Sequence, residues 1–204
     1  MEVVLATRNR KKVAEIKRIT AGLPLIVFTL DDFPECPEVV EDGVTFEENA
    51  VKKAVAIAHC TGKPALADDS GLEVAALDGA PGTHSARYAG EPADDRKNIE
   101  KLLREMRTAD NRTARFTCCI ALAVPEERVH VFFGSVQGYI GKAPKGSSGF
   151  GYDPVFYPSG SDRTFAEMDD VEKDSVSHRG QALEAFKKFI KLWIYRESCG
   201  KEQI

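Results

Sequence analysis

The stretch EVVLATRNRKKVAEIKRI, residues 2–19, decides the fold class of this chain. Its apolar run over 3–6 has no polar alternation, which is typical of a buried strand. Thr7 or Asn9 can then cap a helix whose apolar residues recur every three positions from Val13. A buried strand, a polar turn and a helix, in that order, predict an α/β fold.

The rest of the chain continues both patterns. A T-x-x-E capping box at Thr45 and Glu48 opens a helix with one apolar face, which Gly62 and Pro64 end. A hairpin between helices favours a mixed sheet over a purely parallel one. The other predicted elements are a strand over 64–67, a helix over about 93–106, a hairpin of strands over 116–124 and 129–140, and a last helix from Asp174 or Ser175 to about Tyr195.

The composition of the 204 residues suits one folded domain that spans 1–204. Apolar residues make up 43% and charged residues 29%, so the chain can bury a core and is not a disordered protein. The 28 Lys and Arg residues against 32 Asp and Glu give a net charge of -4. This balance excludes a protein whose main role is to coat nucleic acid, although a few local lysines can still bind phosphate.

The start of the chain and its cysteines predict the cellular location of the protein. No run of about 18 apolar residues exists, so no membrane span is expected. The start MEVVLATRNRKK has its apolar residues before its basic ones, which is opposite to the order in a secretory signal. We therefore expect a cytoplasmic protein whose cysteines are reduced thiols, without disulfides or a zinc site. The five cysteines are Cys36, Cys60, Cys118, Cys119 and Cys199.

The basic turn TRNRKK at 7–12 lies between the first strand and the N-terminus of the first helix. Unpaired backbone N–H groups and the helix dipole favour an anion there, and the lysines add charge. Neither G-x-x-x-x-G-K-[ST] nor G-x-G-x-x-G is present. The alternative is a capped helix with a solvated basic first turn, which the segment alone favours because basic residues at a helix start oppose the dipole.

Two acidic segments contain candidate metal ligands. Glu41 lies in a loop ahead of the capped helix and, unlike Glu48, has no capping role. Asp68 and Asp69 follow an apolar strand, where α/β proteins commonly hold their sites, and an Asx-type turn is the structural alternative. Neighbouring residues of an extended strand point to opposite faces, so the two aspartates are not expected to act as a matched acid/base pair. Mg²⁺ needs only one or two carboxylates, which this pattern can supply.

Two later segments offer groups that suit a flat base. The stretch GSSGFGYDP at 146–154 combines glycines, which allow close approach of the backbone, with the rings of Phe150 and Tyr152. A plain surface loop would explain the glycines but not the paired aromatics. At the start of the last helix, His178 can donate or accept a hydrogen bond and Arg179 offers a rigid fork of donors. A histidine in such a position is also commonly structural.

Six segments in register resemble the inosine/xanthosine triphosphate pyrophosphatase family, whose members are related to the Maf proteins. Arg8 stands where the T-G-N-x-x-K opening of the family has glycine. The resemblance covers almost the whole chain, and it implies an elongated two-lobed α/β fold with a long central mixed sheet flanked by helices and an active-site cleft between the lobes. The segments are TRNRKK at 7–12, EDGVTFEENAVKKA at 41–54, ADDSGLEV at 67–74, GAPGTHSARYAG at 79–90, GFGYDPVF at 149–156 and SHRGQAL at 177–183.

The resemblance also implies an activity. Proteins of this family look like Mg²⁺-dependent homodimers that hydrolyse a nucleoside triphosphate to the monophosphate and pyrophosphate. They prefer deaminated purines (ITP, dITP and XTP) over ATP and GTP, and so keep these bases out of DNA and RNA. A Maf-like pyrophosphatase for pyrimidine or methylated nucleotides and a nucleotide-binding regulator without catalysis are the alternatives. The acidic charge balance disfavours an RNA-binding module.

The expected roles of the site residues combine this resemblance with side-chain chemistry. Asp69 is the expected general base, orienting water for in-line attack at the α-phosphorus, and together with Glu41 it would hold Mg²⁺. Asp68 would support the metal site indirectly. Phe150 and Tyr152 would pack on the purine while polar groups beside them read its edge. The expected substrate-binding residues are Thr7, Arg8, Asn9, Arg10, Lys11, Lys12, Lys53, Ser70, Phe150, Gly151, Tyr152, Asp153, Lys173, His178 and Arg179.

Overall fold

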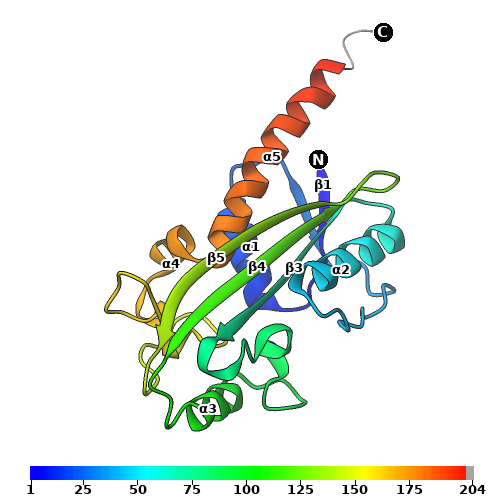
Figure 1. Cartoon of the computed structure of the whole chain (residues 1–204). Coiled ribbons are helices and arrows are strands. Elements are labelled where there is room, and N and C mark those ends of the chain that lie inside the picture. The colour runs from blue at the N-terminus through cyan, green and yellow to red at the C-terminus, as the bar shows by residue number, and fades with distance from the viewer. Residues whose placement is uncertain (201–204) are drawn as a thin grey trace.

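The computed structural model describes the backbone of residues 1–200 and the side chains of 1–195. Within these residues, six strands form one sheet in the order β2-β1-β3-β4-β5-β6 (Figure 1). β1 pairs in parallel with β2 and β3, whereas β3 to β6 pair antiparallel, which confirms the mixed sheet. The strands are β1 (Glu2–Leu5), β2 (Ile26–Thr29), β3 (Ala65–Val74), β4 (Thr113–Ala123), β5 (His130–Ile140) and β6 (Phe156–Pro158).

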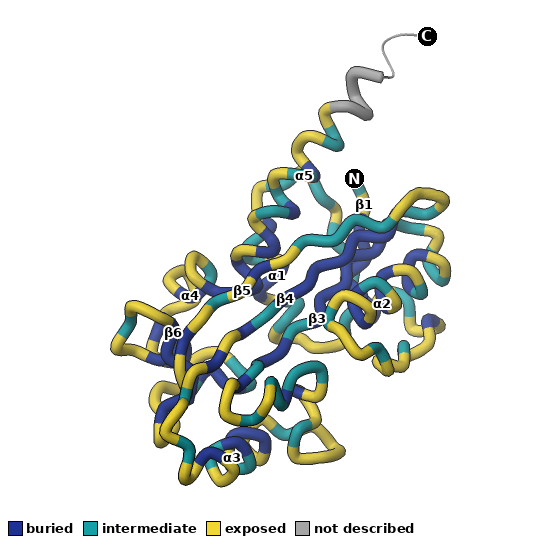
Figure 2. The backbone as a smooth tube through the Cα atoms, in the orientation of Figure 1, coloured by how far each residue is buried: buried dark blue, intermediate teal, exposed yellow. Residues whose placement is uncertain are grey.

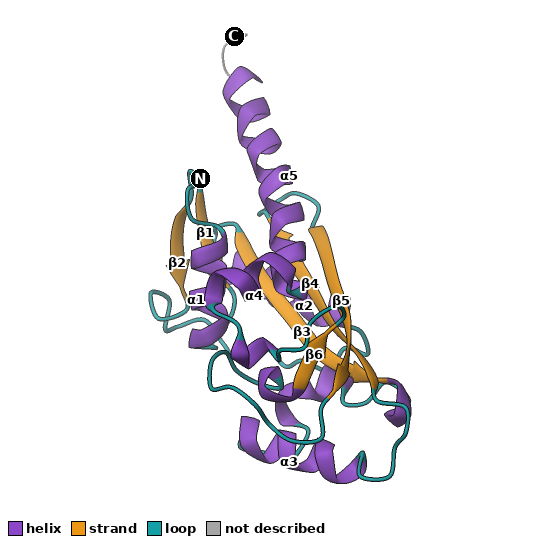
Figure 3. Cartoon of the chain, turned by 90° about the vertical axis from the view of Figure 1, so that its left-hand side faces the viewer, coloured by secondary structure: helices purple, strands orange, loops and turns teal. Residues whose placement is uncertain are grey.

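Helices cover both faces of the sheet, as Figures 1 and 3 show. On one face α2 (Phe46–Thr61) packs in an apolar cluster with alternate residues of the central strands, such as Ala67 of β3. On the other face α1 (Arg10–Ile19) and α5 (His178–Gly200) pack on the intervening residues of the same strands, such as Leu66 of β3. Between these helices the central strands contain uninterrupted apolar runs, 65–67 in β3 and 118–123 in β4, as expected where both faces of a strand are buried.

The C-terminal halves of β3 and β5 and the N-terminal half of β4 belong to a second lobe. There α3 (Asp95–Glu105) and β6 pack around a separate apolar cluster that includes Leu102 and Phe165. β4 is buried continuously over 118–123, on the side of α2, and alternates between buried and more exposed residues over 113–117, toward this lobe (Figure 2). The elongated two-lobed shape expected from the resemblance is therefore present. The remaining helices are α4 (Asp170–Val176) and the 3-10 helices η1 (Ala75–Leu77), η2 (Gly82–Arg87), η3 (Asp153–Val155) and η4 (Phe165–Glu167).

Both helices have the predicted kind of N-cap, and of the two candidates for α1, Thr7 and Asn9, the cap is Asn9. The side chain of Asn9 accepts hydrogen bonds from two N–H groups in the first turn of α1, at 3.0 and 3.2 Å. Thr45 caps α2 by accepting a bond from the N–H of Glu48 at 3.1 Å. The Glu48 carboxylate accepts from the N–H of Val44, not from that of Thr45, so the reciprocal half of the capping box is shifted by one residue. Local sequence patterns thus position both helices that border the site.

Asp68 and Asp69 lie inside β3, which corrects the prediction of a strand that ends at residue 67. Every residue of β3 pairs with β4, from Ala65 to Val74. This pairing satisfies the backbone N–H and C=O groups, so the strand continues through polar side chains. The same pairing rules out the Asx-type turn at this position.

The last helix begins later than predicted, since α4 and α5 are separated at Ser177. Ser177 has an extended backbone, and its hydroxyl accepts a hydrogen bond from the N–H of Gly180 at 3.0 Å. A Cβ atom on Gly180 would lie 1.8 Å from the carbonyl oxygen of Asp174, so only glycine allows this close turn. Neither α5 nor any other helix in the described part of the chain is long and apolar enough to cross a membrane.

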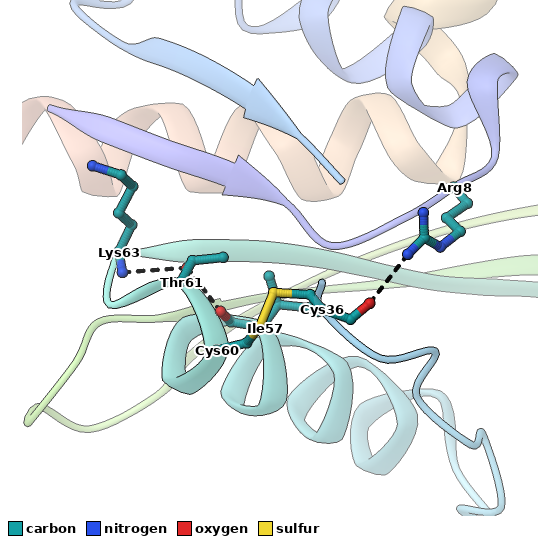
Figure 4. Close-up of a disulfide and its surroundings, with 6 residues drawn as sticks. All are labelled: Arg8, Cys36, Ile57, Cys60, Thr61 and Lys63. Atoms are coloured by element: carbon teal, nitrogen blue, oxygen red, sulfur yellow. Dashed lines mark hydrogen bonds between the residues drawn. A yellow bond between two sulfur atoms is a disulfide. The ribbon is translucent and has the colours of Figure 1, made fainter. Parts of the chain in front are cut away.

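Cys36 and Cys60 form a disulfide, so the expectation that every cysteine is a reduced thiol is wrong (Figure 4). Cys36 lies between β2 and α2, Cys60 lies in the last turn of α2, and their Cα atoms are 5.9 Å apart. Their spacing of 24 residues does not predict that they pair, because the contact is created by the packing of the intervening segment on α2. Cys118 and Cys119 are free and buried, whereas the side chain of Cys199 lies outside the described residues.

Reduction of this disulfide is expected to lower the free energy of unfolding. The bond links residues 24 apart, and opening a loop of that size costs about 3 kcal/mol by the chain-entropy relation. Thermal melting of the wild-type chain with and without a strong reductant measures the effect. The double variant Cys36→Ser/Cys60→Ser should melt where the reduced wild type melts and should not respond to reductant. An unchanged melting temperature on reduction of the wild type would contradict the prediction.

Candidate functional site

Two adjoining cavities form a groove between the lobes. The larger, of about 330 Å³, and the smaller, of about 100 Å³, share Asn9, Lys12, Ser70 and Ala86 in their walls. We call the larger cavity the charged half and the smaller one the aromatic half. The charged half is lined by residues that include Thr7, Arg8, Glu41, Lys53, Asp69 and Arg87. The aromatic half is lined by residues that include Phe116, Phe150, Gly151, Tyr152, Asp153, Lys173, His178 and Arg179.

Most of the expected site residues therefore meet in one groove, although they come from distant parts of the sequence. Arg10 and Lys11 line neither half, and both are exposed at the start of α1. The Nζ atom of Lys11 lies 3.6 Å from a carboxylate oxygen of Asp95, on the opposite lobe. A further hollow of about 640 Å³ lies between α1, α4 and α5, away from these side chains.

Asp69, Glu41 and Lys53 form a triad in the charged half, in which Asp69 and Lys53 are buried and Glu41 is exposed. The Nζ atom of Lys53 donates to Asp69 at 2.8 Å and to Glu41 at 2.7 Å. Burial raises the pKa of Asp69 to about 6, the charge of Lys53 opposes this rise, and a hydrogen bond with Glu41 adds to it. Burial also opposes ionisation of Glu41, but its hydrogen bond with Asp69 and the charge of Lys53 lower its pKa. Asp69 can thus accept a proton near neutral pH.

The donor set around Asp69 fits magnesium. Two carboxylates, Asp69 and Glu41, face one another, and no group of three His, Cys, Asp or Glu side chains arranged for a metal occurs among the described residues. Mg²⁺ is usually held by one or two carboxylates together with water and substrate phosphates, whereas structural zinc needs four protein ligands. The site thus suits an ion whose coordination is completed by the substrate.

Asp68 points to the opposite face of β3 and belongs to a different network. Its carboxylate accepts from Arg179 at 2.8 Å, from Ser70 at 2.9 Å and from the thiol of Cys118 at 3.3 Å, and it pairs with Lys12 at 2.5 Å. Burial would raise the pKa of Asp68, but the charges of Arg179 and Lys12 outweigh it and hold the pKa well below its usual range. Asp68 remains ionised and holds two cations in place, so it cannot serve as a base.

Glu15 is a buried acid that the sequence did not reveal. Its carboxylate accepts from Lys173 at 2.7 Å and from Arg179 at 2.5 Å, and it is 6% exposed. Lys173 in turn donates to Asp153 at 2.6 Å. Glu15 therefore connects α1 to both cations of the aromatic half. A glutamate on an amphipathic helix normally faces solvent, so nothing in the local pattern marked it.

His178 is held by stacking in the aromatic half. Its ring lies parallel to that of Phe116, with the ring centres 4.6 Å apart and 7° between the planes. Its Nδ1 atom is buried without a hydrogen-bond partner among the described residues. Burial, with the charge of Arg179 adding to it, lowers the pKa of His178 well below its usual value, so the ring stays neutral. Phe116 was not predicted as a site residue, because as the first residue of the predicted strand over 116–124 it resembled any other strand residue of the core.

The loop with Phe150, Tyr152 and Asp153 closes the aromatic half. The backbone N–H of Phe150 donates to Asp153 at 2.8 Å, and a Cβ atom on Gly149, whose φ is +72°, would lie 2.1 Å from the same carboxylate. Tyr152 is almost fully buried, and its hydroxyl donates to the carbonyl oxygen of Ser85 at 2.8 Å. Phe150 is half-buried, so its ring, more than that of Tyr152, is available to a ligand.

The comparisons with known proteins agree with this geometry. Residues 3–189 match the Ham1 family. A dITP/XTP pyrophosphatase of Geobacter sulfurreducens is 52% identical over 187 residues, which cover 91% of this chain and 94% of the relative. One of Desulforamulus reducens is 50% identical over 97% of this chain and 100% of the relative.

Solved structures show the same similarity. That of a HAM1 protein from Coxiella burnetii has a TM-score of 0.86 and 44% identity, covering 94% of this chain and 98% of the other. That of the Staphylococcus aureus Ham1 protein has a TM-score of 0.85 and 41% identity, with the same coverage. The match extends over nearly the whole length and includes every segment of the groove, and the chain therefore belongs to the Ham1 family.

Proposed function

We propose that the protein hydrolyses the triphosphates of deaminated purines (dITP, ITP and XTP) to the monophosphate and pyrophosphate, with Mg²⁺ as cofactor. The observation that carries the proposal is the division of one groove into two halves. Carboxylates and lysines line the half that suits a polyphosphate, and aromatic rings with buried polar groups line the half that suits a base. Relatives about 50% identical over most of the chain bear the name dITP/XTP pyrophosphatase, which supports the same activity.

In this proposal the charged half performs the chemistry. Asp69 takes a proton from a water molecule, the water oxygen bonds to the α-phosphorus, and the bond from that phosphorus to the bridging oxygen breaks so that pyrophosphate leaves. Asp69 and Glu41 would hold Mg²⁺, which supplies charge neutralisation for the phosphates. Lys12 and Lys53, together with the backbone at the start of α1, bind the phosphate oxygens.

The aromatic half would select the base. Four of the five N–H groups of Arg179 donate to Asp68, Ser70 and Glu15, which leaves one N–H on Nη1 for a ligand. This N–H would donate to the oxygen at C6 of hypoxanthine or xanthine, whereas the amino group of adenine offers it no acceptor. Leaving a buried polar group unpaired costs about 1–3 kcal/mol, so adenine would be rejected roughly tenfold or more.

The alternatives differ in features of the same groove. A nucleotide-binding regulator would need both halves but not the Asp69–Glu41 pair, which the chain retains. A Maf-like enzyme for pyrimidines would not be expected among relatives named for dITP and XTP. A cytoplasmic location and a homodimeric assembly belong to the proposal through the resemblance of the sequence to its family.

Pyrophosphate release from a panel of dITP, XTP, dATP and dGTP, each with Mg²⁺ and with a chelator, tests the proposal. We expect release from dITP and XTP, rates at least tenfold lower for dATP, and no release in chelator until Mg²⁺ is restored. Orthophosphate as the first product would refute the reaction assigned here. Equal rates for dATP and dITP would refute the proposed selection of the base.

A further inference from the structure

The segment GAPGTHSARYAG at 79–90 contributes residues to the walls of the groove, but none of its side chains has a part in the mechanism proposed above. Its helix η2 is fixed directly against β3. A Cβ atom on Gly71 would lie 2.4 Å from the carbonyl oxygen of Gly82, so the two backbones touch next to Asp69 and Ser70. The hydroxyl of Ser85 accepts a hydrogen bond from the N–H of Leu72 at 2.9 Å. Both ends of this contact are buried, so the backbone of η2 is anchored beside the groove at Ser85, two residues before Arg87.

The residues of η2 follow the groove from one half to the other. Ser85 lines only the aromatic half, Ala86 lines both halves, and Arg87 lines only the charged half. The opposite wall has the same order, since Asn9 lines both halves and Arg8 only the charged one. Arg87 therefore stands on the second lobe at the end of the groove away from the base, where the outer phosphates of a triphosphate would lie.

The two lysines of this half are already paired with carboxylates. Lys53 is paired with two carboxylates and Lys12 with Asp68, so the positive charge that each lysine offers to a phosphate is already partly neutralised. Arg87, by contrast, pairs within the described residues only with the exposed Glu91, at 3.5 Å. An exposed pair of this kind is weak, so the guanidinium can leave it for a phosphate at little cost.

We propose that Arg87 binds the pyrophosphate portion of the substrate, and of the product, from the second lobe. The inference rests on the proposed function for the identity of the substrate. A guanidinium donates two parallel N–H bonds to a phosphate, which a lysine cannot reproduce. Its effect on turnover would be largest as negative charge moves onto the leaving group.

Direct binding of inorganic pyrophosphate, with Mg²⁺ present, tests the inference by titration calorimetry. We expect Arg87→Ala to weaken binding about 10- to 100-fold and Arg87→Lys to restore part of the loss. Inosine monophosphate should bind equally to wild type and variants, because Arg87 is absent from the aromatic half. Arg96→Ala is the matched control, since Arg96 forms the same kind of 3.5 Å pair with Glu100 on α3 and lines neither half.

The outcomes separate this inference from the proposed function. Unchanged pyrophosphate affinity in Arg87→Ala would overturn the role of Arg87, even if the wild type hydrolyses dITP. An equal loss of affinity for the monophosphate would also overturn it, because that pattern indicates a general disturbance of the groove. If the wild type released no pyrophosphate from dITP but its pyrophosphate affinity still depended on Arg87, the inference would stand and the proposed reaction would fail.

Discussion

Asp69→Asn is expected to reduce turnover of dITP by at least about a thousandfold, because the amide can neither accept the proton of the attacking water nor supply a charged metal ligand. The side chain keeps its size, and Lys53 keeps Glu41 as a partner at 2.7 Å. The fold should therefore be retained. Steady-state assays of pyrophosphate release, together with thermal melting, separate a loss of chemistry from a loss of structure.

Asp42→Asn is the matched control for this substitution. Asp42 neighbours Glu41 and pairs with Lys52 at 2.5 Å, but it is exposed and lines neither half of the groove. An exposed ion pair contributes little, so activity and stability should stay close to wild type. Turnover by Asp69→Asn within tenfold of wild type would remove Asp69 as the base and place the chemistry elsewhere.

Arg179→Ala is expected to destabilise the protein by about 3–5 kcal/mol, the usual result of removing one partner from a buried ion pair. Arg179 is 2% exposed and neutralises Asp68, which is 1% exposed, as well as Glu15. Its removal leaves buried carboxylates with fewer partners. Urea denaturation of wild type and variant measures the difference in the free energy of unfolding.

Two further variants identify the cause of this loss. Adding Asp68→Asn to Arg179→Ala should recover part of the stability, because the unpaired charge is then removed. Arg18→Ala breaks an arginine–aspartate pair with Asp174 that is partly exposed, and it should cost no more than about 1 kcal/mol. A cost below 1 kcal/mol for Arg179→Ala would show that the buried network contributes little to stability.

The same residue tests the selection of the base. Arg179→Lys keeps the charge beside Asp68 but removes the fork of donors, so it should fold more readily than the alanine variant. We expect its preference for dITP over dATP to fall, because the N–H directed at the C6 oxygen is lost. A full preference in both variants would show that another group reads that edge of the purine.

The sequence by itself determined the features that depend on neighbouring residues. The strand, turn and helix of residues 2–19, the cap at Thr45 and the hairpin of β4 and β5 formed as predicted, and Asn9 is the one of the two candidates, Thr7 and Asn9, that caps α1. The division of Asp68 and Asp69 between two faces of a strand was equally local, because side chains alternate along any extended backbone. The six segments of the resemblance also indicated the family.

Only the tertiary structure decided which residues from distant parts of the sequence contact one another. Glu15 meets Lys173 and Arg179 across 158 and 164 residues of chain, and Cys36 meets Cys60 because an irregular segment packs on α2. The continuation of β3 through two carboxylates likewise required β4 as its partner. Periodicity records which face of an element is buried, but the partner of a buried group is set by the packing of elements that are distant in sequence.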